Sequence, residues 1–149
     1  HDGARKMEHK TFPYEEATRI PLIISFLGES KEGSVDKTHL VSNGLDLLPT
    51  LCDYAEIDIP NELNGRSLRP LTLAQSDSKW RRNLLIESTN SRAIQDNRYK
   101  YILYNQGNNR EQFFDLQTDP NEMVNLINEL EYIAPFEALK SKLIKSMEV

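Results

Sequence analysis

The longest hydrophobic run in the chain, residues 20–26, shows no alternation between apolar and polar positions. A short continuous run of this kind is typical of a strand buried on both faces of a sheet that helices cover. Such a strand needs neighbours, and nothing else in the sequence resembles it. We therefore expect residues 20–26 to be the last strand of an α/β sheet whose other strands lie outside this sequence.

The next apolar residues recur at the helical spacing i, i+3, i+4 and i+7: Leu48, Leu51, Cys52 and Ala55. This pattern predicts a helix with one apolar face that ends near Glu56. Asp46 is expected to cap its N-terminus, and Pro49 then falls in the first turn, where no backbone N–H is needed. Because Cys52 lies on the apolar face, we interpret it as a small core residue and not as a nucleophile.

The second half of the chain has a different pattern. Four short segments separated by turn residues predict an antiparallel meander: 84–88, 91–95, 99–104 and 111–116. We expect a tight turn at residues 96–97 and a looser one at residues 105–109. A C-terminal helix covering one face of the meander is predicted by five apolar residues at helical spacing: Phe136, Leu139, Leu143, Ile144 and Met147.

These elements predict a fold of two parts, an α/β fragment followed by an α+β unit. Residues 1–79 would carry the end of an α/β domain, namely its last strand and helix, and a surface connection with one packed element near residues 68–73. Residues 80–149 would form a small subdomain of four antiparallel strands and a closing helix.

Composition narrows the functional classes. The chain has 149 residues, and 18 Lys and Arg against 23 Asp and Glu give a net charge of -5, which argues against a nucleic-acid-binding protein. No apolar run approaches the ~20 residues of a membrane span. A single cysteine excludes an internal disulfide framework. Since the chain opens on His1-Asp2-Gly3, we expect a processed chain or a fragment.

Motifs for a complete catalytic site are missing from the sequence. There is no His-x-x-x-His or Cys-x-x-Cys pair for a transition metal, no Gly-x-Ser-x-Gly and no phosphate-binding glycine loop. His39 is interpreted as a loop histidine. Glu15 and Glu16 are adjacent, so their side chains diverge; Glu15 is expected to orient or cap its surroundings.

A group of cationic side chains precedes the expected strand: Arg5, Lys6, His9, Lys10 and Arg19. Such a cluster at the edge of an α/β sheet suits an anionic group such as sulfate, phosphate or carboxylate. The alternative is a solvated basic loop in which Arg19 pairs with Glu15 or Glu16.

Five segments, taken in order, resemble the C-terminal part of the type I sulfatases, the formylglycine-dependent members of the alkaline phosphatase superfamily. The segments are 10–24 (KTFPYEEATRIPLII), 45–51 (LDLLPTL), 63–68 (LNGRSL), 98–102 (RYKYI) and 114–126 (FDLQTDPNEMVNL). They are similar to the family patterns K-x-x-x-Y-E-x-x-x-R-x-P, D-L-x-P-T-L, L-x-G-x-S-L, R-Y-K-Y and Y/F-D-L-x-x-D-P-x-E-x-x-N-L. The order of the segments across almost the whole chain makes the resemblance specific.

The resemblance implies a sulfuric ester hydrolase with an alkaline-phosphatase-like sheet, in which a formylglycine attacks sulfur and calcium polarises the sulfate oxygens. The family's Cys/Ser-x-Pro-x-Arg nucleophile signature does not occur here. Its calcium ligands match no residues of this sequence, so no metal ligand is assigned. The chain alone is therefore expected to be inactive.

One catalytic residue carries over from the family. Lys10 matches the lysine that contacts the sulfate and offsets negative charge on the leaving side. Many relatives have a histidine five residues earlier, where this sequence has Arg5, so Arg5 and His9 are binding candidates. Arg92 is a further candidate from the C-terminal unit, with a surface arginine as the alternative.

The resemblance also sets the expected partners, a sulfated small molecule or sulfated sugar. We further expect the isolated chain to self-associate through the apolar surface around residues 20–26. Two alternatives stay open, a phosphatase or phosphonate hydrolase of the same superfamily, and a non-catalytic binding module that kept the scaffold. The sequence does not indicate a cellular compartment, although sulfatases that act on polysaccharides are commonly exported.

Overall fold

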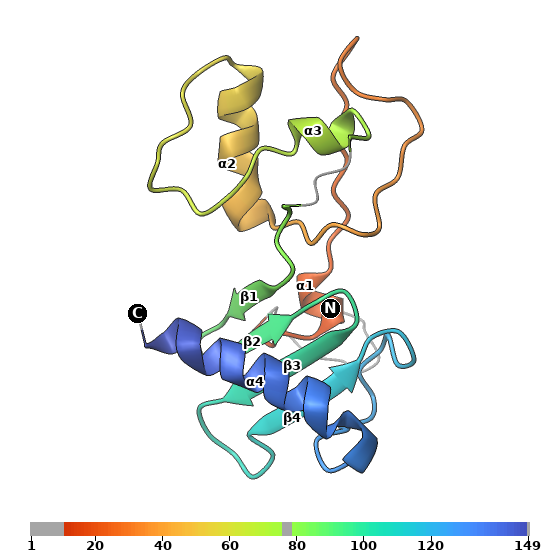
Figure 1. The fold of residues 1–149 in the computed structure, drawn as a ribbon, viewed down its shortest axis with the longest axis vertical. Coiled ribbons are helices and arrows are strands. Elements are labelled where there is room, and N and C mark those ends of the chain that lie inside the picture. The colour runs from red at the N-terminus through yellow and green to blue at the C-terminus, as the bar shows by residue number, and fades with distance from the viewer. Residues whose placement is uncertain (1–10, 76–78, 149) are drawn as a thin grey trace. The chain divides into compact units, whose positions relative to one another are not determined.

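The computed structural model describes residues 11–75 and 79–148, whose contacts form two units. The first unit contains residues 11–20 and 83–148, with helix α1 (Glu15–Thr18), four strands, the 3-10 helix η1 (Leu130–Tyr132) and helix α4 (Ile133–Met147). The second unit, residues 21–82, contains helices α2 (Asn43–Tyr54) and α3 (Arg69–Thr72) (Figure 1). No helix in the described ranges is long and apolar enough to cross a bilayer.

The predicted antiparallel meander is confirmed. Its strands are β1 (Leu84–Glu87), β2 (Ser91–Gln95), β3 (Tyr99–Tyr104) and β4 (Glu111–Asp115), in the spatial order β1-β2-β3-β4. The tight turn between β2 and β3 is held by Asp96, whose Oδ1 accepts the N–H groups of Arg98 and Tyr99 at 2.8 and 2.7 Å. The looser turn between β3 and β4 uses Gly107 at φ +105°, a conformation that suits glycine.

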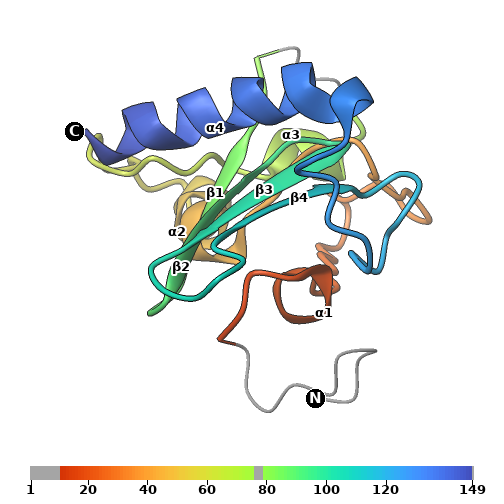
Figure 2. The same cartoon turned by 90° about the horizontal axis from the view of Figure 1, so that it is seen from below.

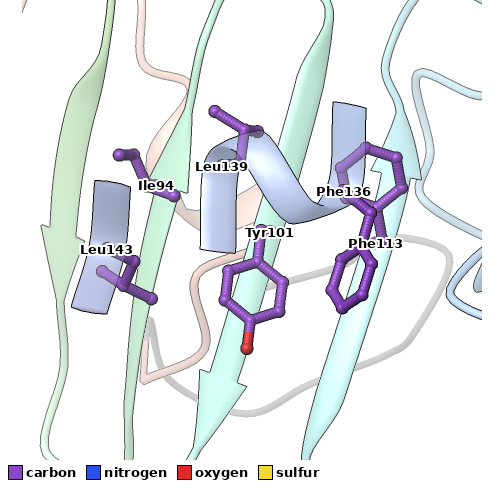
Figure 3. Packing of buried hydrophobic residues seen from close by; sticks show 6 residues of the cluster. All are labelled: Ile94, Tyr101, Phe113, Phe136, Leu139 and Leu143. Carbon is purple, nitrogen blue, oxygen red and sulfur yellow. The ribbon is translucent and has the colours of Figure 1, made fainter. Parts of the chain in front are cut away.

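Helix α4 covers one face of the sheet, where it packs on β2 and β3. Three side chains of the helix and three of the strands form this core (Figure 3): Phe136, Leu139, Leu143, Ile94, Tyr101 and Phe113. Two residues of the predicted apolar face, Ile144 and Met147, are instead 42% and 44% exposed. Ile144 follows Leu143 by about 100° around the helix, and Met147 lies in the last turn, so both flank the buried stripe.

The opposite face of the sheet is covered by the segment that contains α1, so the sheet lies between α4 and α1 (Figure 2). Tyr14 packs here on Ala93, Ile102 and Phe114, and its ring meets that of Phe114 edge-on at 6.1 Å between centroids. Strand residues alternate between the two faces, which explains why adjacent side chains such as Tyr101 and Ile102 belong to different cores.

Helix α2 of the second unit differs from the prediction at its start. It begins at Asn43 after Ser42, so Pro49 lies inside the helix and Asp46 is not its N-cap. Asp46 is instead fully buried, and its Oδ2 accepts the Ser42 N–H at 2.8 Å. Pro49 has no N–H for the Leu45 carbonyl, and Gly65 packs there so closely that a Cβ at position 65 would lie 1.7 Å from that oxygen.

Residues 20–26 do not form the predicted strand, since all strands of the described residues belong to the meander. The segment is extended, and Ile23 is 88% exposed. The apolar face of α2 is also exposed at Leu48 and Leu51, and Cys52 is only half-buried. Both differences have one cause: a strand needs a hydrogen-bonded neighbour and an apolar helix face needs a covering layer, and the described part of this unit supplies neither.

The short packed element expected near residues 68–73 is confirmed as α3. Leu68, just before it, is buried, and its N–H donates to Thr50 Oγ1 of α2 at 2.9 Å. Arg69 extends from α3 to Glu29 Oε2, with Nη2 at 2.6 Å, and to Asp53 Oδ1, with Nη1 at 3.2 Å. The segments 45–51 and 63–68, which carry two of the family motifs, are therefore in direct contact.

Candidate functional site

Three of the four predicted site residues, Arg5, His9 and Lys10, lie outside the described residues. The fourth, Arg92, lies on β2 opposite Glu87 of β1, and its Nε is 2.9 Å from Glu87 Oε1. The two side chains are 47% and 71% exposed. Arg92 shares its sheet face with Ile94, two residues on, and therefore faces the α4 side and not the side covered by α1. This arrangement corresponds to the alternative of a surface arginine.

The segment that follows Lys10 is firmly attached to the sheet. Phe12 packs against the rings of Tyr14 and Tyr104, with centroids 6.4 and 6.3 Å away. Pro13 and Tyr14 are buried, and the Tyr14 hydroxyl donates to Gln112 Oε1 at 2.7 Å. The main chain is thus fixed from a point two residues after Lys10.

A buried ionic cluster, formed by Lys100, Glu15 and Glu122, lies under this segment. Lys100 Nζ is 2.6 Å from Glu15 Oε1, 3.0 Å from Glu122 Oε1 and 3.1 Å from the Pro13 carbonyl oxygen. Glu122 Oε2 also accepts the Glu15 backbone N–H at 2.6 Å. Lys100 and Glu122 are fully buried, and the Glu15 side chain is 15% exposed. The role expected for Glu15, to orient its surroundings, agrees with these contacts.

Charge in the cluster is not balanced, because one ammonium group faces two carboxylates. Burial raises the pKa of Glu122 above its ordinary value of 4.5, and the nearby Lys100 only partly offsets that effect. Glu122 also has φ +54°, in the left-handed region that non-glycine residues seldom adopt. Its position is therefore set by the surrounding contacts and not by local backbone preference.

Each member of the cluster comes from a different family motif. Glu15 belongs to the segment 10–24, Lys100 to the segment 98–102 and Glu122 to the segment 114–126. Sequence analysis did not single out Lys100 or Glu122. The alternation of side chains along β3 could have identified Lys100. It points to the same face of the sheet as Ile102, which is buried, and away from the face of Tyr99 and Tyr101.

The second unit has its own buried ion pair. Asp46 accepts both Nη groups of Arg81 and the Arg66 backbone N–H, the latter at 2.9 Å. Burial alone would raise the pKa of Asp46, but the Arg81 guanidinium and the backbone N–H groups of Ser42 and Arg66 hold it below the ordinary value of 3.8. The resulting stabilisation is present above pH 3.8 and is lost as pH falls through the lowered pKa.

His39 and Cys52 take no part in these clusters. His39 Nδ1 lies 2.6 Å from Asp36 Oδ2, and the imidazole meets the Trp80 ring edge-on. Within residues 11–75 and 79–148, no three His, Cys, Asp or Glu side chains are grouped so that they could hold a metal ion. The buried carboxylates Asp46, Asp115 and Glu122 are paired with arginine or lysine. The described residues therefore do not fit a calcium site.

Comparisons with known proteins agree with the order of the motifs. The sequence matches the family defined for the C-terminal part of N-sulphoglucosamine sulphohydrolase over residues 3–148. It is 36% identical to an arylsulfatase of Clostridium perfringens over 98% of this chain and 31% of the relative. It is 34% identical to a Delta 4,5-hexuronate-2-O-sulfatase of Bacteroides thetaiotaomicron over 84% of this chain and 27% of the relative. The chain thus spans less than a third of these relatives' length.

Solved structures show the same fold. A 2-O GAG sulfatase matches with a TM-score of 0.63 and 32% identity, over 77% of this chain and 27% of that one. Likeness of fold extends to a phosphonate monoester hydrolase of Agrobacterium radiobacter, with a TM-score of 0.52 and 23% identity over 67% of this chain and 23% of that one. The motifs, the sequence relatives and the fold agree, and the chain belongs to the family of C-terminal domains of sulfatases.

Proposed function

We propose that this chain is the C-terminal part of an enzyme that hydrolyses sulfate esters of sugars or other small molecules. The observation that carries the proposal is the match to the C-terminal sulfatase family over residues 3–148. Support for a sugar substrate comes from the 34% identical relative, whose name describes a hexuronate sulfatase. In this proposal the described residues form a scaffold. They do not touch the reacting sulfate themselves but support the neighbouring segments that do.

Lys10 is the proposed catalytic residue of the chain. Its ammonium group would donate hydrogen bonds to the sulfate and offset negative charge as the ester bond breaks. Arg5 and His9 are proposed to bind the remainder of the substrate. The formylglycine nucleophile and the calcium ion that polarises the sulfate oxygens would be held by other segments of the complete enzyme, as expected of a chain whose buried carboxylates are paired with basic side chains.

In the complete enzyme, Lys10→Ala is expected to lower kcat/KM for an aryl sulfate by about 2–4 kcal/mol of transition-state stabilisation, roughly 30- to 1,000-fold. The matched control is Lys31→Ala, which removes an exposed loop lysine and should leave the rate unchanged. The chain of 149 residues alone, assayed with added calcium, should show no turnover. Wild-type kinetics in the Lys10 variant would remove Lys10 from the site, and turnover by the chain alone would contradict the division of roles.

A second candidate is a phosphonate or phosphate ester hydrolase, since the fold is shared with a phosphonate monoester hydrolase. Cationic and metal contacts suit either tetrahedral anion, so the fold does not choose between them. Rates of the complete enzyme on matched sulfate, phosphate and phosphonate esters distinguish the two. A preference for sulfate supports the first proposal, and inactivity on all three would favour a non-catalytic module.

The isolated chain is also expected to self-associate. Its second unit exposes large apolar side chains, including Leu22, Ile23, Leu48 and Leu51. Exposed apolar surface of this kind drives association because burying it removes it from water. Light scattering across a concentration series should give a mass that rises above that of the monomer, and a constant monomer mass at high concentration would contradict the expectation.

A further inference from the structure

The buried cluster of Lys100, Glu15 and Glu122 holds the chain at several points. Lys100 Nζ has three N–H donors, and three oxygen atoms lie within 3.1 Å of it. Two of those oxygens belong to residues 13–15, and Glu122 accepts the N–H of Glu15 as well. The backbone and side chain of residues 13–15 are therefore fixed by two residues from distant parts of the sequence.

Stability alone does not explain such a cluster. Desolvating one ammonium and two carboxylates is costly, and apolar residues of similar volume often stabilise a core as well or better. The net negative charge and the raised pKa of Glu122 show that the balance is incomplete. What the ionic cluster provides, and an apolar core would not, is a single orientation, since each contact requires a particular atom at a particular place.

The fixed segment leads directly to Lys10. Phe12 packs on the sheet, and Lys10 is two positions before it in the sequence, with only Thr11 between them. A change in the course of residues 12–15 would therefore move the point from which the chain continues to Lys10. A displacement of about 1 Å at a catalytic group can cost roughly a hundredfold in rate.

We propose that Lys100 and Glu122 are positioning residues: they hold residues 13–15 on the sheet and so direct Lys10 toward the sulfate ester. The inference rests on the proposed function of Lys10 and adds two residues that do not touch the substrate. Loss of their contacts should lower kcat, since Lys10 would meet the transition state less often, and should leave KM nearly unchanged.

The test compares two carboxylate-to-amide variants of the complete enzyme, Glu122→Gln and Asp115→Asn. Asp115 is the matched control, since it is also buried in the first unit and paired with Arg98 at 2.8 Å, and its further hydrogen bonds join it to Gln117 and Thr118. Rates are measured at a temperature at which thermal unfolding shows both variants to be folded. Glu122→Gln should reduce kcat about tenfold with KM within twofold, and Asp115→Asn should retain the wild-type kcat.

Hydrogen exchange provides a second readout that needs no activity. The Glu15 amide, which loses its charged acceptor, should exchange faster in Glu122→Gln and should be unchanged in Asp115→Asn. If Glu122→Gln does not fold, Glu15→Gln removes the negative charge of the other carboxylate that Lys100 contacts and is judged by the same measurements.

The outcomes separate the inference from the function. Wild-type kcat in Glu122→Gln, or an equal loss in both variants, would overturn the positioning role while leaving the sulfatase proposal intact. A wild-type enzyme that turns over phosphonate but not sulfate would overturn the sulfatase proposal, and the ratio of variant to wild type on that ester would then decide the positioning role. A wild-type enzyme inactive on every ester overturns both.

Discussion

Replacing Lys100 with methionine is expected to lower the free energy of unfolding of the first unit by about 3–5 kcal/mol. The substitution keeps most of the side-chain volume but removes the cation that faces two carboxylates and the Pro13 carbonyl. Glu15 and Glu122 would then be left as buried like charges without a counterion, an arrangement that costs more than the lost hydrogen bonds.

The matched control is Lys140→Met, which makes the same change at a partly exposed pair. Lys140 Nζ lies 2.8 Å from Glu111 Oε2, and the side chains are 29% and 34% exposed, so the expected loss is about 0–1 kcal/mol. Urea unfolding followed by the near-UV circular dichroism of tyrosine measures both, because five of the six tyrosines lie in this unit. Equal losses in the two variants would mean that burial of Lys100 has no special effect.

The effect of Lys100→Met should depend on pH. Without the ammonium group the pKa of Glu122, already raised, should rise further, so the folded variant takes up a proton at pH values at which the unfolded chain does not. More protons bound in the folded state mean that stability increases as pH falls toward 4.5. The gap between wild type and Lys100→Met should therefore narrow on acidification to that pH. If the difference in the free energy of unfolding widened on acidification, the pH dependence would not come from protonation of Glu122.

Asp46→Ala is expected to have an effect of similar size in the second unit, about 3–5 kcal/mol. It leaves the Arg81 guanidinium, only 13% exposed, without its carboxylate and leaves the N–H groups of Ser42 and Arg66 without an acceptor. Each N–H group left without its acceptor adds to the cost. Because these contacts tie α2 to the segments around Arg66 and Arg81, their loss should loosen the whole unit.

Tryptophan fluorescence reports this change directly. The single tryptophan, Trp80, is buried beside Arg81, and its Nε1 donates to the Leu40 carbonyl oxygen at 2.9 Å. Its emission should shift to the red at a urea concentration lower by about 1 M or more in Asp46→Ala. The control Glu29→Ala breaks a partly exposed carboxylate–arginine pair and should shift the midpoint little. An unchanged midpoint in Asp46→Ala would show that its contacts are dispensable.

The meander and α4 were predictable because their signals are local. Turn residues at 96–97 and 105–109 separate the strands, and each strand finds its partner in the next segment of the chain. Helical spacing likewise located Phe136, Leu139 and Leu143. Consecutive antiparallel strands satisfy each other's backbone hydrogen bonds, so every strand of the meander finds its partner within this sequence.

The described structure differs from the prediction where an element depends on residues outside this sequence. A continuous apolar run predicted a buried strand at residues 20–26, and helical spacing predicted an apolar helix face that includes Leu48 and Leu51. The described structure leaves both exposed. The prediction that Asp46 caps the helix was wrong for a different reason. A helix cap and a buried partner for arginine use the same residue types, and only the distant Arg81 distinguishes the two roles.

The ionic cluster of the first unit could not be located from the sequence for the same reason. Glu15, Lys100 and Glu122 are separated by up to 107 residues, and each has an ordinary local context. The resemblance to sulfatases picked out the motifs that contain them but directed attention to Lys10, outside the described residues. Burial and geometry were needed to show that the motif residues contact one another.

The hydrogen bond from Glu15 to Glu122 has a consequence for the order of events during synthesis. The two residues are 107 positions apart, and at 5–20 residues per second a ribosome needs roughly 5–20 s to reach the second after the first. Until β4 has been made, the surface on which Tyr14 packs lacks Phe114, and the surface that buries Pro13 and Tyr14 is incomplete. We therefore expect this segment to dock on the sheet only after β4, the last strand of the meander, has been made.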